Sequence, residues 1–107
     1  MGDGHIDWDE NAMRAAKIDA NHVQCVTALR AAGATVQSLA GVGKGVPDLL
    51  VGHRGHTFLI EVKDGAKSPS KRKLTEDQRD WHAAWQGGTL ATVDGPEAAL
   101  RAIGVVK

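Results

Sequence analysis

The sequence predicts a mixed α/β domain in which helices cover both faces of a small central sheet. Segments with helical and strand periodicity follow one another in the order α-β-β-β-α-β-α. Two neighbouring strand segments, 46–52 and 57–63, are apolar on both faces, which is typical of strands covered by helices on both sides. The length of 107 residues, with 42% hydrophobic and 24% charged residues, suits one globular domain.

The first helix is predicted to begin at a capping box. Residues 1–18 form a polar lead-in with weak periodicity, which could also hold an extra helix. Asn21 and Gln24 have the spacing of an N-cap residue and its N3 partner. Apolar residues then recur at helical spacing as far as Gly33, which is suited to a helix C-terminus. We therefore expect a helix between Asn21 and Gly33.

Three strands are expected next. Residues 34–39 alternate like a strand, and a glycine-rich loop, 41–45, follows them. This loop lacks the spacing of a phosphate-binding P-loop, so no nucleotide cofactor is expected. Segments 46–52 and 57–63 flank His53-Arg-Gly-His56, in which Gly55 can adopt the positive φ of a two-residue hairpin loop.

The last elements are bounded by recognisable caps. A loop rich in Gly, Ser, Pro and Lys covers 64–74, and Thr75 with Gln78 forms a second capping box. The helix it opens carries Trp81 and Trp85, which we expect in the core or at an interface, and ends before two glycines. A strand at 89–93 precedes a final helix with Pro96 in its first turn.

Composition narrows the class of protein. Thirteen basic and thirteen acidic residues give no net charge, and the lone Cys25 fits a reducing compartment. No apolar run approaches the roughly 20 residues of a membrane span, and the acidic start is unlike a signal peptide. These features predict a soluble, cytoplasmic domain with no membrane partner.

The hairpin register brings two carboxylates together. With Arg54 and Gly55 as the loop, Asp48 faces Glu61, and Lys63 follows on the same strand face. Opposed like charges destabilise a sheet unless something compensates, and a hard divalent cation would do so. The alternative is a buried ion pair between Lys63 and one carboxylate, with no metal.

The motifs around this pair resemble a known nuclease family. Gly45-Val-Pro-Asp-Leu-Leu-Val-Gly52, Phe58-Leu-Ile-Glu-Val-Lys-Asp-Gly65 and Leu74-Thr-Glu-Asp-Gln-Arg-Asp-Trp81 are similar to the VRR-NUC branch of the PD-(D/E)XK nucleases. The resemblance covers roughly residues 19–103 and implies that they form a restriction-endonuclease-like PD-(D/E)XK core. It also implies Mg²⁺- or Mn²⁺-dependent hydrolysis of DNA phosphodiesters. It also implies a homodimer comparable to Holliday-junction resolvases, hence four-way junctions as a candidate substrate. Small members are typically phage-encoded, which would place the protein in the cytoplasm of a bacterial host.

The same resemblance assigns roles to individual residues. Asp48 and Glu61 would bind the metal through their side chains and Val62 through its carbonyl, while Lys63 would position water or stabilise the transition state. Gln78 would reach Lys63 or the phosphate, although it could instead serve only the helix cap. The family usually has an acid on the first helix where this chain has Gln24, and Asp19 could substitute for it.

Local basic charge suggests where DNA would bind. The neutral total hides a basic segment after the catalytic strand, and the residues expected to contact DNA are Lys44, Lys67, Lys71, Arg72 and Lys73. Nothing in the sequence specifies base readout, so recognition of backbone shape and charge is expected. The competing hypothesis is a catalytically weak DNA-binding module that keeps the nuclease fold.

Overall fold

The computed structural model describes residues 20–71 and 73–107, without the side chain of Lys71. Within these residues the elements follow the predicted order, with one 3-10 turn added in the loop after the third strand. They are α2 (Ala20–Ala31), β1 (Thr35–Ser38), β2 (Leu49–His53), β3 (His56–Val62), η1 (Pro69–Lys71), α3 (Glu76–Ala84), β4 (Thr89–Val93) and α4 (Pro96–Ala102). The structure is therefore a four-stranded α/β fold, as the sequence predicts.

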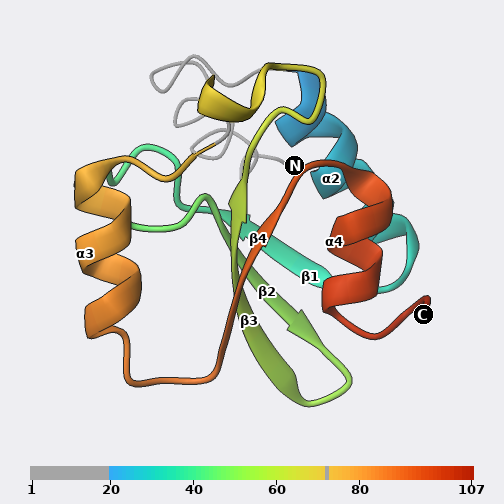
Figure 1. Cartoon of the computed structure of the whole chain (residues 1–107). Coiled ribbons are helices and arrows are strands. Elements are labelled where there is room, and N and C mark those ends of the chain that lie inside the picture. Colours follow the sequence, from blue (N-terminus) through green and yellow to red (C-terminus); the bar gives the residue numbers. More distant parts are fainter. Residues whose placement is uncertain (1–19, 72) are drawn as a thin grey trace.

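The sheet is mixed, with the strand order β1-β2-β3-β4 (Figure 1). The first three strands are antiparallel, whereas β4 is parallel to β3 because α3 returns the chain to the same end of the sheet. The hairpin pairs Leu49 with Ile60 and His53 with His56, which is the predicted register. Arg54 and Gly55 have φ of 51° and 83°, so both central residues of the turn are left-handed, as a type I′ turn requires.

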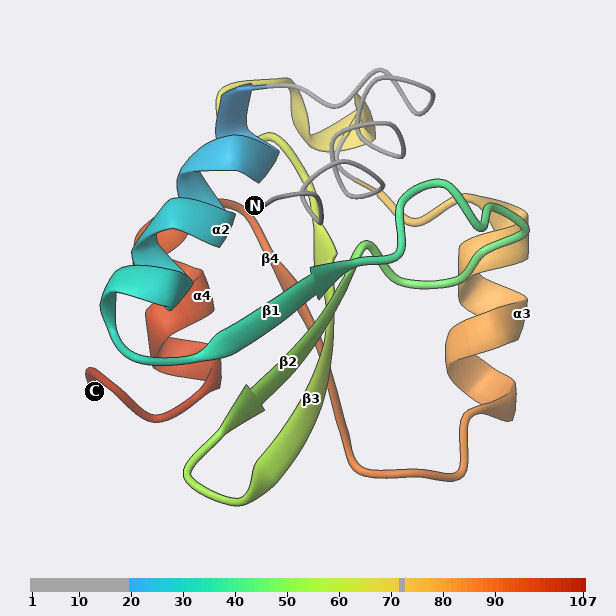
Figure 2. The same cartoon turned by 180° about the vertical axis from the view of Figure 1, so that it is seen from behind.

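One face of the sheet carries the core. Alternate residues of β2 and β3, including Leu49, Val51 and Ile60, are fully buried there against α2 and α4. These two helices lie side by side on this face in both views (Figures 1 and 2). The hydrophobic effect of burying this apolar surface is what holds the two helices on the sheet.

The opposite face is less covered than the sequence predicts. The only described helix on that side is α3, and it contributes no buried residue (Figure 2). Leu50 is 39% exposed on this face, and the rings of Trp81 and Trp85 stack on each other, 5.2 Å apart, instead of entering the core. The contacts of this helix with the sheet include the hydrogen bond from Gln78 to Glu61.

The predicted capping box at Asn21 is wrong. Helix α2 already includes Ala20, so Asn21 is inside the helix and Gln24 is not its N3 residue. The Asn21 amide instead donates to the carbonyls of Lys63, at 2.8 Å, and Asp94, at 3.1 Å. This side chain joins α2 to the ends of β3 and β4.

The capping box at Thr75 is confirmed. The Thr75 hydroxyl accepts from the Gln78 backbone N–H, and the Gln78 side chain accepts from the Thr75 N–H. No helix in the described part of the chain is both long enough and apolar enough to cross a membrane. The lead-in 1–18 and Asp19 lie outside the described residues.

Candidate active site

Three segments bring the predicted catalytic residues together beside the sheet. Asp48 immediately precedes β2, Glu61 and Val62 end β3, and Lys63 directly follows that strand. Gln78 reaches the same place from the first turn of α3. Glu61 is only 2% exposed, whereas Asp48, Lys63 and Gln78 are half-buried.

Backbone hydrogen bonds fix Asp48. Its Oδ2 accepts from the Val62 N–H at 2.8 Å, and its carbonyl accepts from the Leu39 N–H at 2.7 Å. The first bond holds the Asp48 carboxylate against the end of β3, next to Glu61. The predicted juxtaposition of the two carboxylates is therefore present, although regular pairing of β2 and β3 begins one residue later, at Leu49.

The Glu61 carboxyl is poorly disposed to carry a charge without a counterion. Burial, the charge of the nearby Asp48 carboxylate and a hydrogen bond with it together raise the pKa of Glu61 from 4.5 to about 8, while Lys63 acts in the opposite direction. At neutral pH the protonated form of Glu61 is therefore favoured. A cation close to both carboxylates would favour the ionised form.

Gln78 serves the helix cap and the site together. Its Oε1 accepts from the Lys63 ammonium at 2.7 Å as well as from the Thr75 N–H at 2.9 Å. Its Nε2 donates to Glu61 Oε2 at 3.0 Å. The Gln78 amide thus connects the Lys63 ammonium to Glu61. Gln78 therefore both completes the helix cap and reaches Lys63, the two roles considered for it from the sequence.

The structure adds His82, which the sequence analysis does not place in the site. Its Nε2 lies 3.9 Å from Glu61 Oε1, and burial and the charge of Lys63 lower the pKa of its ring. The signal in the sequence is its position four residues after Gln78, which places both side chains on one face of a helix.

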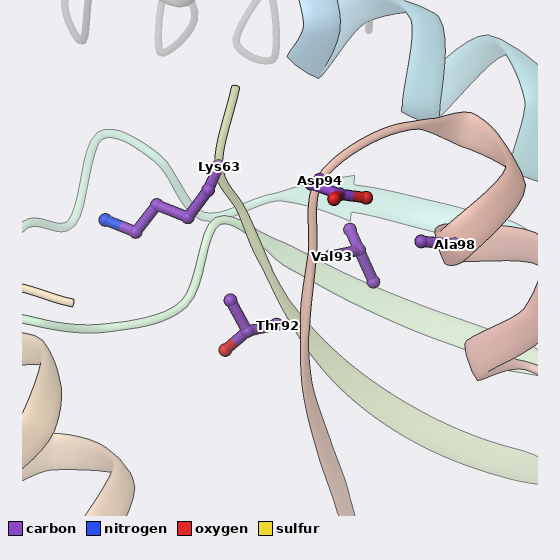
Figure 3. A pocket seen from close by; sticks show the side chains of 5 residues that line it. All are labelled: Lys63, Thr92, Val93, Asp94 and Ala98. Carbon is purple, nitrogen blue, oxygen red and sulfur yellow. The ribbon is translucent and has the colours of Figure 1, made fainter. Parts of the chain in front are cut away.

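A pocket of about 280 Å³ borders the site on the side of β4. It is lined by Lys63, Thr92, Val93, Asp94 and Ala98, and the Lys63 ammonium points away from Asp94 (Figure 3). The stem of Lys63 therefore forms part of the pocket wall, while its ammonium is directed to Gln78.

The candidate donors for a metal ion are two carboxylates. Among residues 20–71 and 73–107, no three His, Cys, Asp and Glu side chains form a group that could hold a metal ion. Asp48 and Glu61 nevertheless suit Mg²⁺ or Mn²⁺, since such ions keep water and backbone oxygens as further ligands. Glu61 Oε1 is buried and has no hydrogen-bond partner in the described structure, so this oxygen is free to bind an ion.

The predicted DNA contacts are only partly described. Lys44, Lys67 and Lys73 are exposed, and Lys44 has a left-handed backbone with φ of 56°. Arg72 and the side chain of Lys71 lie outside the described residues. Gln24, which the sequence analysis compares with an acid usual in the resembled family, is exposed on α2.

Comparisons with known proteins agree with this architecture. No protein-family model matches the sequence, and no curated protein is found similar to it. Among solved structures, the chain is similar to one described as a VRR_NUC domain, with 25% sequence identity and a TM-score of 0.53. The match covers 89% of this chain and 92% of that chain.

Proposed function

We propose that this chain, which its motifs and its fold assign to the VRR-NUC family, is a metal-dependent endonuclease that hydrolyses DNA phosphodiesters. The observation that carries the proposal is the continuous arrangement of Asp48, Glu61, Gln78 and Lys63. Two carboxylates for a cation and one ammonium for a phosphate are the groups that phosphodiester hydrolysis needs.

Asp48 and Glu61 would hold Mg²⁺ or Mn²⁺, with the Val62 carbonyl as a further oxygen donor. The raised pKa of Glu61 supports this assignment, because the ionised form that binds a metal is the one that the metal-free protein disfavours. Binding of the ion would then release a proton from the carboxylate pair.

Each side chain would have a separate part in the reaction. When bound, the ion supplies positive charge and lowers the pKa of a water that attacks phosphorus in line. Lys63, held by Gln78, donates hydrogen bonds to a phosphate oxygen on which negative charge develops. Gln78 also holds Glu61 Oε2, so it keeps the ammonium and the metal-binding carboxylate in fixed relation. By the family resemblance, the products carry 5′-phosphate and 3′-hydroxyl ends.

The proposed substrate is branched DNA, with four-way junctions first among the candidates. The basic residues Lys44, Lys67, Lys71, Arg72 and Lys73 would contact phosphates and would not discriminate bases. Since a junction is resolved by cuts in two strands, the proposal includes a twofold homodimer with two active sites.

The test is a cleavage gel with labelled four-way junctions, duplexes and flaps in Mg²⁺, Mn²⁺ or EDTA. We expect cleavage only with a divalent ion. Asp48→Asn should abolish it, and should also abolish the rise in melting temperature that Mn²⁺ gives the parent by binding the folded state. Asp80→Asn, an exposed aspartate of α3, is the matched control and should behave like the parent.

Lys63→Ala tests the role of the ammonium. Cleavage should fall several hundredfold, which corresponds to about 3–4 kcal/mol on the barrier, while the melting temperature changes little. Junction binding without cleavage in any ion would contradict the proposal and favour the DNA-binding module. If light scattering finds a single protein chain bound to each junction, only the proposed homodimer is contradicted.

A further inference from the structure

Two buried polar atoms face each other next to the carboxylate pair. Glu61 Oε1 and His82 Nε2 each lack a hydrogen-bond partner within the described structure, and they lie 3.9 Å apart. Leaving a buried polar group unpaired costs about 1–3 kcal/mol, so two such atoms pointing at one place call for an explanation. Because the two atoms lie beside the carboxylate proposed to bind the metal, we look for an explanation in the function of the site.

The separation is compatible with a bridging water. At 3.9 Å the two atoms are too far apart for a direct hydrogen bond, but they suit two hydrogen bonds to one water between them. A neutral imidazole nitrogen can donate or accept, and water can do either in return.

The partner of the other oxygen comes from the same helix. Gln78 holds Glu61 Oε2 at 3.0 Å, and His82 lies four residues later, one turn along α3. Holding both oxygens fixes the rotation of the carboxylate, and so fixes how it is presented to an ion beside Asp48. A helix that buries no residue of its own would thus contact the sheet at this carboxylate.

We propose that His82 is a positioning residue that holds Glu61 Oε1 through one water molecule while Gln78 holds Oε2. This inference rests on the proposed function, since it concerns the same metal site. It differs from direct ligation, in which the His82 nitrogen would itself bind the ion.

The experiment measures dissociation constants for Mn²⁺ and Mg²⁺ in the full chain, without DNA. Loss of a residue that orients a metal ligand typically costs 10–100-fold in metal affinity, so His82→Ala should weaken both ions about tenfold or more. His82→Gln should recover most of the loss, because its amide can meet the same water. His56→Ala is the control: this exposed histidine lies at the other end of β3 and should leave both constants unchanged.

The variants should fold, because α3 contributes no residue to the core. His82→Phe keeps a ring without nitrogen and should behave like His82→Ala; its melting temperature checks the packing. Unchanged affinities in His82→Ala and His82→Phe overturn the inference. The inference is also overturned if His82→Ala loses affinity for Mn²⁺ alone and His82→Gln does not recover it. That result would favour direct binding of the ion by the His82 nitrogen.

The parent protein separates this inference from the proposed function. If the parent binds both ions and Asp48→Asn abolishes binding, the metal site stands and His82 alone is judged by its variants. If the parent binds neither ion, the proposed function itself fails. Junction cleavage by the parent in the same ions is the independent check.

Discussion

At the scale of single residues, Glu61 makes the protein sensitive to pH. Its pKa is about 8 in the folded protein against 4.5 in the unfolded chain. Between these values the folded state binds more protons, so its stability falls as pH rises, and the loss is complete above about pH 8. Below pH 4.5 the Glu61 carboxyl is neutral in both the folded and the unfolded state, so its ionisation does not lower the free energy of unfolding.

In EDTA, the melting temperature of Glu61→Gln should therefore exceed that of the parent by an amount that grows as the pH rises from 5 to 8.5. The difference should be smallest at pH 5, because the parent is then largely protonated and resembles the variant. Thermal unfolding at each pH measures it. Glu97→Gln, on the exposed face of α4, reports the effect of removing a surface carboxylate. A difference between parent and Glu61→Gln that does not vary with pH would contradict the prediction.

The residues of the site differ in how far the sequence could predict them. Asp48, Glu61 and Lys63 belong to one hairpin, so strand alternation and the turn at Arg54-Gly55 suffice to place them together. His82 lies on a separate helix, and its distance to Glu61 depends on how closely α3 approaches the sheet. Local sequence pattern does not specify that approach.

At the scale of elements, the position of α3 depends on the preceding glycine-rich loop. Gly45 has φ of 85°, and a Cβ there would collide with the carbonyl of Asp77, in the first turn of α3. The next residue along the helix is Gln78. The loop backbone therefore packs against the turn that directs Gln78 to Lys63 and Glu61.

Gly45→Ala should displace the start of α3 and reduce both metal affinity and cleavage. Gly43→Ala is a close control, because Gly43 also has a positive φ, of 75°, but an added Cβ meets nothing within 4 Å. Both variants bear about 1–2 kcal/mol of backbone strain. Only Gly45→Ala should also lose ion affinity in a titration with Mn²⁺, and equal effects of the two variants would refute this role of the loop.

The elements also show where local signals mislead. Thr75 caps α3 as predicted, and the Gln78 amide completes the capping box while it also contacts Lys63 and Glu61. Asn21 matches a cap equally well in sequence, yet its amide is used to join β3 and β4 to α2. The same side-chain chemistry suits both tasks, so tertiary packing decides between them.

At the scale of the whole molecule, the sheet separates two functions. Helices α2 and α4 pack on one face and form the core, while the carboxylates, Gln78 and His82 lie on the other side with α3 (Figures 1 and 2). The apolar pattern of both hairpin strands predicts helices on both faces. It could not show that α3 would contact Glu61 and leave Leu50 exposed.

Under the proposed function we expect DNA to bind on the side of α3, where the chain from 64 to 74 also connects β3 to that helix. A neutral protein brings a phosphodiester to buried carboxylates only with local cations, and four basic residues follow the catalytic strand: Lys67, Lys71, Arg72 and Lys73. Each phosphate neutralised contributes roughly 0.9 to the slope of log affinity against log salt on duplex DNA. Changing Lys71, Arg72 and Lys73 together to Ala should reduce that slope by up to about 2–3 units and leave the melting temperature unchanged.

The control for this variant removes cations from the other side of the sheet. Arg101 lies on α4 and Lys107 at the C-terminus, and both are exposed. Their joint change to Ala lowers the net charge by two without touching the proposed DNA side, so its salt slope should equal that of the parent. Fluorescence anisotropy with a labelled duplex, from low to moderate salt, measures all three slopes. If the two variants lower the slope in proportion to the charge removed, binding follows net charge alone and the basic segment is not a DNA-binding site.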